Sequence, residues 1–73
     1  MTADWLGRIS CDPAIRGGEP CVKGTRIPVS VLVASLAEVT VEQLLAEYPG
    51  LVREDIQAAL LYAADAAQHT LVA

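Results

Sequence analysis

The sequence lacks phenylalanine and holds only one tryptophan, two tyrosines and one histidine among 73 residues. Cys11 and Cys21 are its only cysteines, too few for a disulfide-stapled mini-protein and without the paired spacing of a zinc site. The single histidine, His69, lies in the C-terminal tail, where it is a poor base for a cysteine nucleophile. No cluster of carboxylates or metal ligands stands out. We therefore expect no enzymatic activity, no metal and no cofactor.

Long uninterrupted apolar runs are also missing, because charged residues recur every few positions. The N-terminus, MTADW, has neither the basic segment nor the apolar stretch of a signal peptide. We therefore expect a cytoplasmic protein without a membrane partner.

What the sequence does have is apolar character, at 53% of its residues, supplied mainly by Ala, Val, Leu and Ile. A chain of this length forms one domain and buries only about 60 to 65% of the surface that its unfolded form exposes. The apolar content exceeds what one small core needs. It predicts a homodimer interface or another protein partner.

The net charge of −4 is unevenly distributed. Residues 1–26 hold four Lys and Arg against three Asp and Glu, whereas residues 27–73 hold one Arg against six Asp and Glu. Such an acidic chain does not bind nucleic acid indiscriminately, so any contact with phosphates is expected in the first third.

The sequence pattern predicts a mostly α-helical domain over residues 1–73, with short N-terminal strands. An arm of strands and turns covers 1–27, with strand candidates near 8–11 and 21–22. Apolar residues at helical spacing predict helices over about 28–37, 40–48 and 53–67, and a fraying tail over 68–73. Thr40 and Gln43 match a capping box for the second helix.

The connection between the second and third helices, at Pro49 to Val52, is short enough to force a steep crossing. This spacing indicates a homeodomain-like helix-turn-helix bundle, although many three-helix domains share it without touching DNA. Five residues are the candidate DNA contacts: Arg8, Arg16, Lys23, Arg53 and Gln57. For Arg53 and Gln57 the alternative is that they are ordinary solvated helix positions.

The segment GGEPCVKGTRIPV, residues 17–29, carries the densest run of glycine and proline. It is not a Walker loop, because Lys23 precedes Gly24 and Thr25 instead of opening a helix, and no βαβ unit surrounds it. We interpret it as a scaffold in which glycines permit positive φ. Arg26 could bind a carboxylate such as Asp12 or could have a functional role; the sequence leaves both open.

Two longer segments, DPAIRGGEPCVKGTRIPV and TVEQLLAEYPGLVREDIQAALLYAA, resemble the bacterial family of domains of unknown function 433 (DUF433), antitoxin-like and grouped with VapB-type antitoxins. The resemblance runs from about Ile9 to Ala64. It implies a small dimeric module with short strands and a helix-turn-helix, often encoded beside a PIN-like nuclease. The residues that carry the family's structural motif include Asp12, Gly17, Gly18, Pro20, Gly24, Thr25, Arg26 and Pro28.

The sequence departs from the family pattern at three positions. Arg16 stands where Cys is common, Glu38 where Gly usually ends the first helix, and Val52 where Ser or Thr usually caps the third. Losing the hydroxyl cap, or placing a non-glycine residue in a left-handed helix terminus, should each cost about 1 kcal/mol.

From the residues and the resemblance we expect the antitoxin of a type II toxin–antitoxin pair. It would sequester a PIN-like ribonuclease and bind its own operator as a dimer. Trp5, Leu61 and Ala64 are the candidate residues for the toxin or dimer interface. The alternative is a dimerisation or protein-interaction module that binds no DNA.

Overall fold

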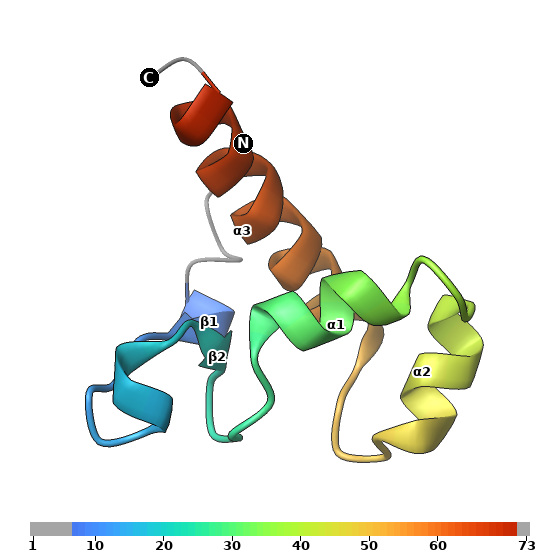
Figure 1. Ribbon diagram of the computed structural model, residues 1–73. Helices are drawn as coiled ribbons and strands as arrows, with labels where there is room; N and C mark the ends of the chain where they lie inside the picture. The colour runs from blue at the N-terminus through green and yellow to red at the C-terminus, as the bar shows by residue number, and fades with distance from the viewer. Residues whose placement is uncertain (1–6, 72–73) are drawn as a thin grey trace.

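The computed structural model describes residues 7–71, and the side chains among them up to Gln68. Its elements follow in the order β1 (Ile9–Ser10), the 3-10 turn η2 (Arg16–Gly18), β2 (Cys21–Val22), α1 (Val29–Ser35), α2 (Val41–Glu47) and α3 (Arg53–Leu71). The long helix α3 packs against α1, α2 and β1 (Figure 1). The predicted fold class is therefore confirmed: a mostly helical domain with a small N-terminal sheet.

The two strands pair antiparallel, with Ile9 opposite Val22 and Ser10 opposite Cys21. Between them the chain turns back through η2, where Gly18 adopts a φ of 91°. A Cβ atom added at Gly18 would lie 3.8 Å from the Cα of Pro13. A side chain there would be strained, as the prediction of a glycine scaffold requires. Arg16 also has a positive φ, of 51°, and is the one non-glycine residue in the described range to do so.

Helix α1 begins after Pro28, whose φ of −70° suits a helix start, and it is shorter than expected. Its end unwinds through turn bonds from the Ala37 and Glu38 amides to the carbonyls of Ala34 and Ser35. Glu38 is not among the residues with positive φ. The prediction of a left-handed backbone conformation at Glu38 is therefore wrong, and the loss of stability predicted from it does not apply.

The second helix begins with the predicted capping box: Gln43 N donates to the Thr40 hydroxyl at 3.1 Å, and Thr40 N donates to Gln43 Oε1 at 2.8 Å. Helix α3 begins differently. Val52 has no hydroxyl, but its amide donates to Asp55 Oδ2 at 3.0 Å. Half of a capping box thus remains, supplied by the carboxylate in the first turn of α3.

The core lies where α1, α2 and α3 meet β2. Its most deeply buried large side chains are Leu32, Leu44, Ile56 and Cys21. A single apolar stripe along α3, through Ile56, Ala59 and Leu60, would predict a buried Leu60, but Leu60 is 42% exposed, while Ala58 is fully buried. Because α3 is contacted by α1, α2 and β1, its buried face differs from a single helical stripe.

Helix α3 continues past Ala67 to Leu71, so the expected fraying from residue 68 is not observed within the described range. Its C-terminal end projects beyond α1 (Figure 1). No helix in the described part of the chain is both long and apolar enough to span a membrane.

Candidate functional site

Asp55 connects the N-terminal arm to the helix-turn-helix. The carboxylate is nearly buried, and each of its oxygens accepts one hydrogen bond. Arg8 Nη1 donates to Oδ1 at 3.0 Å, and the Val52 amide donates to Oδ2. Arg8 was predicted to contact DNA, but its guanidinium is held against the start of α3.

A second ion pair joins α2 to α3. Arg53 Nη2 lies 2.7 Å from Glu42 Oε2, and both side chains are more than half exposed. The hydrogen bond from Arg53, aided by a backbone hydrogen bond and the charge of the guanidinium, holds the pKa of the Glu42 carboxyl below its ordinary value. Arg53, another predicted DNA contact, is therefore also engaged within the molecule, whereas Gln57 is exposed.

The third ion pair lies in the loop before β2. Arg16 Nε donates to Glu19 Oε1 at 3.0 Å, and Ser30 at the start of α1 donates to the other oxygen of Glu19 at 3.2 Å. Both members of the ion pair are more than a third exposed, so it contributes little to stability. It does connect the loop to α1.

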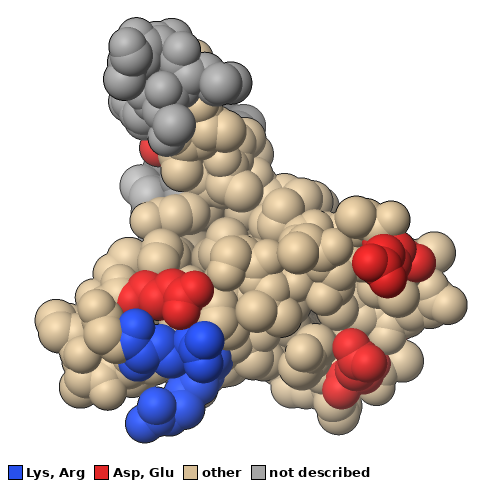
Figure 2. Space-filling model, viewed as in Figure 1, with Lys and Arg blue, Asp and Glu red and all other residues tan. Residues whose placement is uncertain are grey.

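Lys23 and Arg26 differ from these three arginines. Both are exposed, and neither forms an ion pair with any of the described residues. The contact considered between Arg26 and Asp12 is absent, because Asp12 Oδ1 accepts the Ala14 amide at 2.9 Å in a local turn. On the face shown in Figure 2, basic side chains gather at the end of the molecule that holds β1, η2 and β2, with acidic side chains directly beside them, and further acidic side chains lie toward α2.

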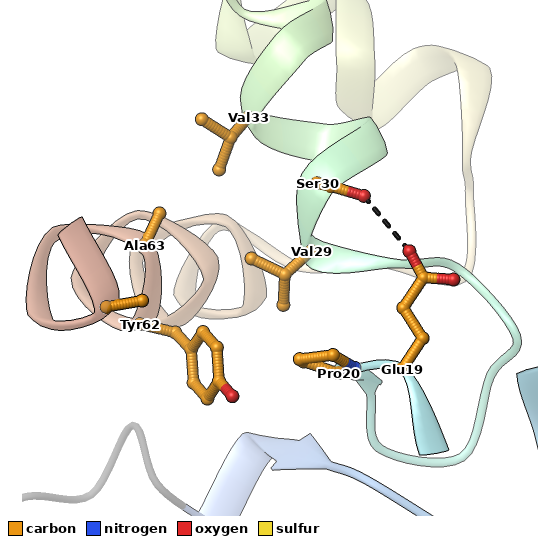
Figure 3. A pocket seen from close by; sticks show the side chains of 8 residues that line it. Glu19, Pro20, Val29, Ser30, Val33, Tyr62 and Ala63 are labelled. Atoms are coloured by element: carbon orange, nitrogen blue, oxygen red, sulfur yellow. Dashed lines mark hydrogen bonds between the residues drawn. The ribbon is translucent and has the colours of Figure 1, made fainter. Parts of the chain in front are cut away.

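A shallow apolar groove of about 350 Å³ runs between α1, α3 and the start of β2. Figure 3 shows Val29 and Val33 of α1 facing Tyr62 and Ala63 of α3, with Pro20 closing one end. The hydrogen bond between Ser30 and Glu19 forms the polar rim on the α1 side. Burial raises the pKa of the Tyr62 phenol, whose oxygen lies 4.0 Å from Cys11 Sγ.

A different apolar surface covers the side of α3 that faces away from the core. We call it the outer strip and define it as Leu60, Leu61 and Ala64, all exposed. Leu61 and Ala64, predicted as interface residues, thus lie together on this strip at helical spacing. Trp5, the remaining predicted interface residue, lies outside the described residues.

Residues of the family's structural motif shape the turns beside these surfaces. Thr25 Oγ1 donates to the Val22 carbonyl at 2.8 Å and accepts the Ile27 amide at 3.0 Å. Gly17, Gly18 and Gly24 all have positive φ. Among the residues with described side chains, no three of His, Cys, Asp and Glu come together as metal ligands would.

Comparison with known proteins places the chain in a family. The family model described as "Protein of unknown function (DUF433)" matches residues 9–63. The uncharacterized protein y4eO of Sinorhizobium fredii (strain NBRC 101917 / NGR234) is 43% identical over 56 residues, which are 75% of this chain and 25% of that protein. A crystal structure of a DUF433 member protein from Anabaena variabilis ATCC 29413 matches with a TM-score of 0.77 and 38% identity.

That match covers 85% of this chain and 62% of the Anabaena chain, so both relatives are substantially longer than the segment they share with it. The family match nevertheless includes both strands, α1, α2 and the first half of α3. The chain therefore belongs to the DUF433 family of proteins of unknown function.

Proposed function

We propose that this protein is a non-enzymatic antitoxin-like module, which binds and blocks a PIN-like ribonuclease and, as a homodimer, contacts operator DNA. The observation that carries the proposal is the outer strip. Leu60 and Leu61 are each 42% exposed on a helix that already supplies the core with its opposite side. Adjacent exposed leucines beside an alanine form the kind of apolar surface that a protein partner covers.

The C-terminal end of α3 supports self-association. Residues 64–68 are all exposed, and α1 does not extend along them (Figure 1). A second copy of the chain, packed along this end of α3, would bury its exposed surface.

Inhibition of the nuclease would follow from covering its active site. PIN-like sites gather carboxylates around a divalent metal, and such a site can be blocked by a guanidinium or by an apolar helix over its entrance. Arg16 and Arg53 are held in ion pairs. The outer strip is the exposed apolar helix surface that could cover the entrance of such a site.

Co-expression of the chain with the PIN-like nuclease of a neighbouring gene tests the proposal. The wild-type chain should rescue growth, and Leu61→Asp should weaken rescue, because a carboxylate would be buried in the interface. Val31→Asp, an equally charged change at a residue of α1 that is 40% exposed, is the matched control and should rescue fully. Full rescue by a folded Leu61→Asp variant would exclude the outer strip as the interface.

The competing function is a dimerisation module that binds no DNA. Three of the four predicted cationic DNA contacts are in internal ion pairs, which favours this alternative. The helix-turn-helix arrangement and the two unpaired cations favour the operator-binding form. Binding of the promoter duplex no tighter than random duplex would decide for the alternative.

A further inference from the structure

The turn between β2 and α1, residues 22–27, is closed by hydrogen bonds at its base and carries unpaired N–H donors at its tip. The Val22 amide donates to the Ile27 carbonyl at 3.0 Å, the Thr25 amide donates to the Val22 carbonyl at 3.0 Å, and the Thr25 hydroxyl bonds both Val22 and Ile27. These bonds close the base of the turn. Lys23 and Arg26 extend from it on either side of Gly24 and Thr25.

The tip of this turn has unused hydrogen-bond donors as well as unpaired charge. The Gly24 and Arg26 amides donate to no acceptor among the described residues. Gly24 has a φ of 82°, and a Cβ built there would meet no atom within 4 Å, so its backbone is open to an approaching ligand. Backbone N–H groups beside a positive-φ residue, together with cationic side chains, form a concave anion site.

The carboxylates that could neutralise these cations are engaged elsewhere. Glu19 is held by Arg16 and Ser30, and Asp55 by Arg8 and the Val52 amide. Asp12 accepts the Ala14 amide. The positive charge of Lys23 and Arg26 is therefore available to a ligand.

The same turn lies beside the helix-turn-helix. The Lys23 amide donates to the Arg8 carbonyl at 2.8 Å, and the Arg8 guanidinium bonds Asp55 in the first turn of α3. In Figure 1 this turn and the connection from α2 to α3 point to the same side of the molecule. The start of α3 carries the exposed carboxylate of Glu54, and its Arg53 is already paired with Glu42 of α2, so it is poorly suited to bind phosphates.

We infer that the 22–27 turn, through Lys23, Arg26 and the Gly24 and Arg26 amides, is the site that binds backbone phosphates of a nucleic-acid duplex, in place of the start of α3. The inference rests on the operator-binding part of the proposed function. Contacts to backbone phosphates carry no sequence information, so this contact is independent of sequence and positions the protein on the duplex.

Salt dependence tests the inference. Two cations per protomer give a dimer a slope of log K against log salt of about −3.6, at about −0.9 per phosphate neutralised. We measure binding of a fluorescent random-sequence DNA duplex by anisotropy over a series of salt concentrations. Arg26→Gln should reduce the slope by about 1.8. Arg53→Gln changes the net charge equally and should leave the slope unchanged, so an equal effect of both variants would overturn the inference.

A second test uses the wild-type protein, so its result does not depend on whether a variant folds. In an amide nitrogen–proton NMR titration with the same duplex, Gly24 and Arg26 should show the largest shifts. Shifts confined to residues 53–57 would assign the contact to α3 and contradict the inference. Binding to an acidic peptide without binding to the duplex would contradict it too. If the wild-type chain does not bind the duplex but still binds the nuclease, the inference about the 22–27 turn fails while the proposed antitoxin role stands.

Discussion

At the scale of single residues, Asp55 is the side chain with the most consequences, because it holds both the Val52 amide at the start of α3 and the Arg8 guanidinium of the arm. Asp55→Ala removes both hydrogen bonds from a nearly buried position and should lower the free energy of unfolding by about 1.5 to 3 kcal/mol. Urea unfolding measures this loss.

Glu54→Ala is the matched control for that substitution. Glu54 is the neighbouring carboxylate in the same turn of α3 but is exposed, so its removal should change stability by no more than about 0.5 kcal/mol. Equal unfolding midpoints for the two variants would show that the buried contacts of Asp55 are not what stabilises this junction.

The ion pair of Glu42 with Arg53 predicts a pH effect. Because the folded pKa of Glu42 is lowered, its favourable contribution is present above its unfolded value of 4.5 and is lost as the pH falls through the folded pKa. Arg53→Gln should raise the pKa of Glu42 part of the way back, since the backbone hydrogen bond remains. NMR titration of the Glu42 carboxyl carbon measures it, and an unchanged pKa would contradict the pairing.

At the scale of elements, the N-terminal caps of α2 and α3 can be compared by substitutions at Thr40 and Val52. Helix α2 has both halves of a capping box, whereas α3 has only the carboxylate half, because Val52 replaces a hydroxyl residue. Val52 is 48% exposed, so Val52→Thr sacrifices little apolar burial. It should raise the free energy of unfolding by about 0.5 to 1 kcal/mol, and Thr40→Ala should lower it by about 1 kcal/mol. A Val52→Thr variant no more stable than wild type would show that Asp55 alone satisfies the cap.

The helices and strands were predictable because their signals are local. Helical spacing of apolar residues, the Thr40 and Gln43 pair and the glycine turns each act over a few residues, and the observed elements agree closely at their starts. The end of α1 and the exposure of Leu60 were not predictable from one helical stripe. Both depend on how α1, α2 and β1 surround α3.

The candidate site was much less predictable. Arg8 and Asp55 are 47 residues apart, and nothing in either segment indicates that the arm docks at the start of α3. The groove likewise draws on residues from α1, α3 and the arm. The sequence could supply the number of cations, but which of them remain unpaired depends on these long-range contacts. Lys23 and Arg26 emerge as the unpaired ones because the carboxylates are engaged elsewhere.

At the scale of the whole molecule, the arrangement separates two kinds of surface. The outer strip and the groove lie on α3 and are apolar, whereas the unpaired cations lie on the turn after β2. This separation would allow a dimer to hold a protein partner and a duplex at the same time. The DUF433 family membership identifies the fold but no partner.

The central claim is that the outer strip binds a partner protein. Light scattering on material from size-exclusion chromatography, after co-expression with the proposed PIN-like nuclease partner, tests it most directly. We predict a complex whose mass contains both chains, and loss of that complex for Leu61→Asp but not for Val31→Asp. A folded chain that elutes free of the folded nuclease would contradict the account.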